Sequence, residues 1–143
     1  MDIVYSLPFV SPANLLLCSI VAAAALIYFP YLVVAAGRFQ VGYEMGAPRG
    51  MFDKLPDYAK RASWAHDNAW ESFALYVPAA LMGYVVTLPA QQVIGSVIVY
   101  LVARVAYALF YILNIPILRS LSWALSISSI FSLYLSSCQA AVS

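Results

Sequence analysis

Long apolar stretches constrain this chain more than any other feature. A helix needs about 20 predominantly apolar residues to cross the roughly 30 Å hydrocarbon core of a bilayer. Four stretches of the 143-residue chain meet this requirement, at residues 13–36, 58–88, 91–113 and 117–138. We therefore expect an all-α integral membrane protein in which one domain, residues 1–143, forms a bundle of four transmembrane helices.

The composition excludes several other classes of protein. Hydrophobic residues make up 64% of the chain and charged residues only 9%, whereas about a quarter of the residues in a soluble domain are charged. A net charge of +1 provides no basic surface for nucleic acid. Cys18 and Cys138 both lie in apolar segments, and two cysteines are too few for a zinc site or a disulfide framework. No metal and no nucleic acid are expected as partners.

Charged residues gather in one part of the chain. Ten of the thirteen (7 basic and 6 acidic in all) lie between Arg38 and Glu71, and five of these ten are Lys or Arg. Because basic residues favour the cytoplasmic side, we expect residues 37–57 to form a cytoplasmic loop, and both termini to lie on the opposite side. Glycines and prolines recur in this loop, so a continuous helix is not expected there. No basic cluster of a cleavable signal peptide precedes the first span, which should therefore be retained.

A polar stretch, residues 61–73, interrupts the apolar pattern at the start of the second span. On a helix that turns about 100° per residue, Arg61, Asn68 and Glu71 share one face, and His66 lies on roughly the opposite face. Lipid would leave the amide and the carboxylate without hydrogen-bond partners. This face must therefore point toward protein, water or a ligand, and we take it as the centre of a candidate site.

A second polar group lies inside the third span. The spacing of the polar residues places Arg104 on one stripe of a helix together with Tyr100, Tyr107 and Tyr111. The arginine lies about 15 Å inside the span, at 1.5 Å per residue. A cation at this depth needs an acceptor within the bundle, and a structural ion pair with Glu71 would provide one.

These polar residues form two separated groups along the chain. The first comprises Arg61, Ala62, Ala65, His66, Asn68, Glu71 and Phe73. The second comprises Arg104, Tyr107, Tyr111, Pro116 and Arg119. Together they resemble the MAPEG family, the membrane-associated proteins in eicosanoid and glutathione metabolism, and especially its bacterial branch. The resemblance extends over residues 12–138.

The resemblance implies an assembly, a ligand and roles for particular residues. It implies a homotrimer in membrane lipid, with glutathione held between neighbouring subunits near the cytoplasmic face. The residues implied in binding glutathione are Arg38, Arg61, His66, Asn68, Glu71, Tyr107 and Tyr111. Glu71 would meet the ammonium group, and His66 would serve the neighbouring subunit's site. Arg119 would lie beside the sulfur as the catalytic residue, because a nearby cation stabilises a thiolate.

The implied activity is a transferase or peroxidase that acts on lipophilic electrophiles or lipid hydroperoxides. One residue departs from the family pattern. Four residues before Asn68, where glutathione enzymes of this family have an arginine, this chain has Trp64. Tryptophan cannot pair with a carboxylate, so either Arg61 takes that role or the ligand differs. The alternative function is a non-catalytic membrane bundle of the same fold that binds lipid or small molecules, or that acts as an assembly partner.

Each of these residues also has an interpretation without a ligand. Arg104 and Glu71 could form an ion pair that only fixes the bundle. His66 could be an interfacial hydrogen-bonding residue, and the tyrosines could pack or anchor the helices at the interface. Arg119 could be an ordinary topology signal at a cytoplasmic helix end.

Overall fold

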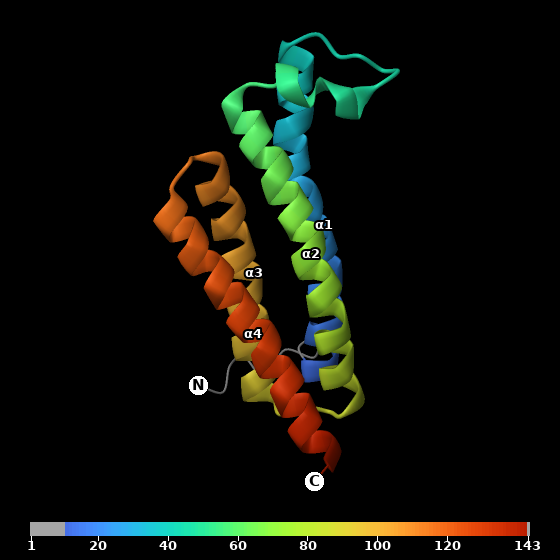
Figure 1. The fold of residues 1–143 in the computed structure, drawn as a ribbon. Helices are drawn as coiled ribbons and strands as arrows, with labels where there is room; N and C mark the ends of the chain where they lie inside the picture. The colour runs from blue at the N-terminus through green and yellow to red at the C-terminus, as the bar shows by residue number, and fades with distance from the viewer. Residues whose placement is uncertain (1–10, 143) are drawn as a thin grey trace.

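The chain folds into two helical hairpins. The computed structural model describes residues 11–142, so the two ends of the predicted domain lie outside the described residues. The helices are α1 at Pro12–Gln40, a 3-10 helix η2 at Pro48–Lys54, α2 at Asp57–Val85, α3 at Ala90–Ile112 and α4 at Pro116–Val142. The most extensive contacts join α1 to α2 and α3 to α4, and the two hairpins lie against each other (Figure 1).

Every element found in residues 11–142 is helical, as predicted. Three of these helices, α1, α3 and α4, are long and apolar enough to cross a membrane. α2 has sufficient length, but its first half carries most of the charged residues of the helix. Among the described residues, three of the four predicted spans are thus long and apolar enough to cross a membrane. The number of four spans remains a prediction.

Residues 37–57 do not form a continuous helix, but part of the predicted loop is helical. α1 continues through Gly37 to Gln40, and η2 occupies part of the connection. Gly37 does not end the helix because it is a point of close approach between α1 and α2. A Cβ atom placed on Gly37 would lie 2.5 Å from the Cβ of Ala59. The glycine therefore serves helix packing and not a turn.

The two short connections end their helices with the same motif. α2 ends at Val85, three residues before the predicted Leu88, because Thr87 has a positive φ of 57°. The Leu88 N–H then donates to the Gly83 carbonyl at 3.1 Å. α3 ends in the same way, with Asn114 at a φ of 60°. Both ends are Schellman motifs, which satisfy the last carbonyls of the helix and turn the chain sharply.

A stacked pair of tyrosines joins the helices in the apolar interior. The rings of Tyr76 on α2 and Tyr100 on α3 are parallel within 1°, with centroids 3.7 Å apart. The Tyr76 hydroxyl lies 2.6 Å from the hydroxyl of Ser19 on α1, and the Tyr100 hydroxyl lies 3.3 Å from that of Ser72 on α2. Each phenol therefore has a polar partner where lipid or an apolar core would offer none. Arg104 follows Tyr100 by one turn of α3.

The packing at Gly37 generates a prediction about stability. Gly37→Ala should destabilise the fold by about 1 to 3 kcal/mol, because the added methyl group overlaps Ala59 and forces the helices apart. Thermal unfolding of the purified protein in detergent measures this loss. Adding Ala59→Gly to the same chain should restore most of the stability. Gly95→Ala is the matched control, since nothing lies within 4 Å of a Cβ there. Equal effects at Gly37 and Gly95 would contradict the packing argument.

Candidate functional site

A buried arginine is connected to the surface through an asparagine. Arg104 is only 6% exposed, and its Nη1 donates to Oδ1 of Asn68 at 3.1 Å. Nδ2 of Asn68 in turn donates to Oε2 of Glu71 at 2.9 Å. The Arg104 guanidinium also lies over the ring of Tyr107, 4.5 Å from its centroid. The predicted ion pair between Arg104 and Glu71 is thus replaced by a relay through Asn68.

Small residues allow the helices to approach each other around this relay. Ala65 on α2 and Ala108 on α3 are 1% and 6% exposed. Together with Ala69 and Tyr100, both line a small cavity of about 10 Å³ beside Arg104. Larger side chains at these positions would push α2 away from α3 and separate Asn68 from the guanidinium.

A pocket of about 470 Å³ opens where the relay reaches the surface. The residues that line it are Trp64, Asp67, Asn68, Glu71, Tyr107 and Tyr111. Asp67 and Glu71 are exposed acids, and among the described residues neither Arg nor Lys contributes to the lining. The pocket therefore combines two carboxylates, an amide and three aromatic rings. Such a lining suits a ligand with an ammonium group and an apolar or planar part.

Arg119 reaches this pocket through Tyr111. The guanidinium of Arg119, in the first turn of α4, lies over the Tyr111 ring at 4.6 Å from its centroid. Tyr111 also makes an edge contact with Tyr107, with ring centroids 5.5 Å apart. The sharp turn at Asn114 brings the start of α4 back beside the end of α3. A fixed positive charge therefore lies behind one wall of the pocket.

Trp64 adds a further aromatic wall to the pocket beside Tyr111. Trp64 is 46% exposed, and its ring lies between those of Phe52 and Tyr111, at centroid distances of 5.8 Å and 6.4 Å. Phe52 comes from η2, so the prediction of an irregular loop missed it. Arg61 is directed elsewhere, since its Nε donates to the Ile112 carbonyl at the end of α3, at 3.0 Å. Arg61 caps a helix.

A second pocket, of about 540 Å³, lies along an adjacent stripe of α2. It is lined by Tyr31, Val34, Arg38, Pro48, Arg49, Phe52, Leu55, Ser63, His66, Asp67 and Trp70. His66 Nδ1 donates to the Ile27 carbonyl on α1 at 2.8 Å, so the neutral ring keeps Nε2 as an acceptor. Nε of Arg38 is buried without a hydrogen-bond partner among the described residues. The sequence did not single out Arg49, which is a second cation in this pocket.

The predicted site residues therefore fall into three groups. Asn68, Glu71, Tyr107 and Tyr111 line the first pocket, with Arg119 behind it. Arg38 and His66 line the second pocket. Arg61 is engaged with the end of α3. A single chain does not bring the first two groups into one pocket, and among the described residues Asp67 alone lines both pockets.

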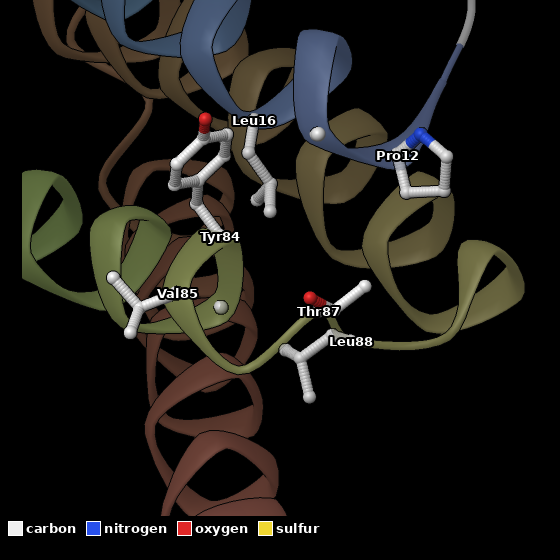
Figure 2. A pocket seen from close by; sticks show the side chains of 8 residues that line it. Pro12, Leu16, Tyr84, Val85, Thr87 and Leu88 are labelled. Atoms are coloured by element: carbon white, nitrogen blue, oxygen red, sulfur yellow. The ribbon is translucent and has the colours of Figure 1, made fainter.

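Another cavity, of about 270 Å³, lies at the opposite end of the bundle, between the start of α1 and the end of α2. Figure 2 shows its lining, in which Pro12 and Leu16 face Tyr84, Val85, Thr87 and Leu88. Among the described residues, its polar side chains are a phenol and an alcohol, and none of them contributes a carboxylate, amine or imidazole. The candidate site is therefore not placed there. Within residues 11–142, no three His, Cys, Asp or Glu side chains are grouped as metal ligands would be.

Comparisons with known proteins identify the family of the chain. The family model described as MAPEG family matches residues 15–138. No match was found among the curated proteins or among the solved structures. The matched region contains all four long helices almost completely, together with both pockets of the candidate site. The chain therefore belongs to the MAPEG family.

Proposed function

We propose that the chain is a membrane-bound enzyme that uses glutathione as co-substrate. It would act as a transferase on lipophilic electrophiles or as a peroxidase on lipid hydroperoxides that reach the site from the bilayer. Membership of the MAPEG family supports a membrane protein of glutathione-related chemistry. The particular reaction, the site residues and the assembly described below are our proposals.

The relay from Arg104 through Asn68 to Glu71 is the observation that carries this proposal. It holds a carboxylate at the mouth of a pocket of about 470 Å³, beside two phenols. Glutathione has an ammonium group that Glu71 can bind and amide groups that Asn68 and the tyrosines can meet. A charge-assisted hydrogen bond to a carboxylate held in place by other contacts is stronger than one to a free side chain.

The carboxylate beside the ammonium group of glutathione requires a cation, and a neighbouring subunit of a homotrimer would provide it. Within residues 11–142, no Arg or Lys lines the first pocket, whereas Arg38 and Arg49 line the second pocket. The buried, unpartnered Nε of Arg38 favours an anion nearby, since an unsatisfied donor is costly. When the first pocket of one subunit faces the second pocket of the next, Arg38 and His66 complete the site.

Arg119 is the proposed catalytic residue. A free thiol has a pKa near about 8.5 and reacts as the thiolate, so an enzyme working at neutral pH must stabilise the anion. The Arg119 guanidinium is always protonated and lies behind the wall formed by Tyr111, 4.6 Å from the centre of its ring. It would hold negative charge on the sulfur until the bond to the electrophile forms. The amide groups at the start of α4 would add to this positive potential.

A second candidate is a non-catalytic bundle that binds lipid or a small molecule, or that assembles with a larger complex. Trp64 favours it, because the aromatic ring gives the pocket an apolar wall. Measured binding of glutathione to the purified protein separates the two candidates. Binding with a thiolate signal supports the enzyme, and its absence supports the second candidate.

The role of Arg119 leads to a test on the bound thiol. Arg119→Ala should raise the pKa of bound glutathione toward about 8.5 while leaving most of its affinity, because the lost charge acts on the sulfur. Thiolate absorbance against pH, measured on the purified protein, gives this pKa directly. Arg119→Lys, which keeps a cation, should give an intermediate value. Arg104→Ala should instead impair assembly, since it removes the partner of Asn68 and Tyr107. An unchanged thiol pKa in folded Arg119→Ala excludes this residue from the chemistry.

The intersubunit site can be tested by mixing subunits. Glu71→Gln alone and Arg38→Ala alone should each remove most of the activity with glutathione. Coexpression of the two variants should restore part of the activity. In mixed trimers, some subunit interfaces combine an intact Glu71 from one subunit with an intact Arg38 from the next. Mixing the purified, separately assembled variants is the control and should restore nothing while the subunits do not exchange. A site confined to one chain predicts no recovery on coexpression.

We also propose that the connection between α1 and α2 is cytoplasmic and that both termini lie on the other side. Lys54 and Gln91 are exposed at opposite ends of α2. In a chain with Cys18→Ala and Cys138→Ala, Lys54→Cys should react with an impermeant thiol reagent only from the cytoplasm, and Gln91→Cys only from the other side. Reaction of both from one side excludes the topology of four spans.

A further inference from the structure

Trp64 lies at the cytoplasmic end of the first pocket, far from the acid that would bind an ammonium group. Glu71 lies seven positions after Trp64 on the same face of α2, which corresponds to about 10 Å along the helix axis. An extended tripeptide spans about the same length, at 3.3 to 3.6 Å per residue. A peptide thiol whose ammonium binds Glu71 therefore brings its other end to Trp64.

The surroundings of Trp64 are unfavourable for a carboxylate. Phe52 and Tyr111 flank its ring at centroid distances of 5.8 Å and 6.4 Å. Asp67, an exposed acid one turn further along α2, lines the same pocket. An anionic group at this end would lose water against the rings and would be repelled by Asp67.

Among the described residues, no Arg or Lys lines this pocket, so the described part of the chain places no cation in its wall at this end. Arg61, one turn before Trp64, donates its Nε to the Ile112 carbonyl at 3.0 Å. Arg104 is 6% exposed and donates to Asn68 at the deeper end. Arg119 lies over the ring of Tyr111. In the proposed trimer, the cations of the neighbouring subunit bind the carboxylate next to the ammonium group. They are therefore not available for a carboxylate at the Trp64 end of the pocket.

We infer that Trp64 determines which peptide thiol the site accepts, and that it selects one whose end opposite the ammonium group is uncharged. This inference rests on the proposed function and specifies its co-substrate. The chemical class is a γ-glutamyl thiol with one carboxylate fewer than glutathione, as in an amide, an ester or a decarboxylated form. The neutral end packs on the rings of Trp64 and Tyr111, which line the pocket, and the ammonium group binds Glu71.

The test compares glutathione with its glycine monoethyl ester, in which an ethyl ester replaces the terminal carboxylate and removes its negative charge. Calorimetry on the full-length protein in detergent should show the ester binding about tenfold more tightly than glutathione, the change expected for removing one unpaired charge from a partly buried site. Trp64→Arg should reverse this preference, because arginine pairs with a carboxylate through two hydrogen bonds. Trp64→Phe, the matched control, should retain the preference for the ester.

The outcomes separate this inference from the proposed function. If neither compound binds the wild-type protein, the proposed function fails, and the inference fails with it. If glutathione binds as tightly as the ester, the site is a glutathione site and the selection by Trp64 is wrong. Asp67→Asn changes an exposed residue and provides a second variant should Trp64→Arg not assemble. Asp67→Asn should reduce the preference for the ester over glutathione severalfold, because it removes the repulsion between Asp67 and the terminal carboxylate. An unchanged preference in this variant counts against the inference.

Discussion

A charged guanidinium in the interior of an apolar bundle is the constraint on which the rest of this structure depends. Arg104 cannot face lipid, and it is buried without a direct carboxylate partner. Its charge is accommodated by the amide of Asn68 and the ring of Tyr107, and the amide passes the interaction on to Glu71. This arrangement depends on the polar half of α2 and on the stripe of α3 that carries Arg104 and the tyrosines. It also depends on the small residues that let the two helices approach each other. The candidate site is the surface end of a contact that the bundle needs in order to fold.

The sequence predicted this centre because polar residues are costly in a membrane and must find one another. Asn68, Glu71, Tyr107, Tyr111 and Arg119 do lie together around one pocket. What the sequence could not predict depends on distances between helices. A glycine that allows close packing has the same sequence signal as one that turns the chain, so Gly37 was assigned wrongly to a loop.

Other residues of the site were missed for a related reason. Phe52 and Arg49 lie in a short 3-10 helix whose sequence carries no periodicity, and only the folded chain brings them to α2. Arg61 lies on the predicted face, but its Nε bonds to a backbone carbonyl on another helix, and a carbonyl gives no signal in the sequence. The sequence thus predicted which polar side chains gather. It did not predict which backbone groups bond to them or which segments pack against α2.

The stacked tyrosines have a consequence for the site, although they do not touch it. Tyr76 and Tyr100 hold α2 and α3 ring to ring, and Ser72 ties the same two helices by a hydroxyl contact. A slip of one residue would rotate a helix by about 100° and move it by 1.5 Å, which breaks both contacts at once. Arg104 lies one turn beyond Tyr100, and Asn68 lies one turn before Ser72. The stack therefore sets the register in which amide and guanidinium meet, and the alignment of a polar site is fixed by an aromatic pair deeper in the apolar interior.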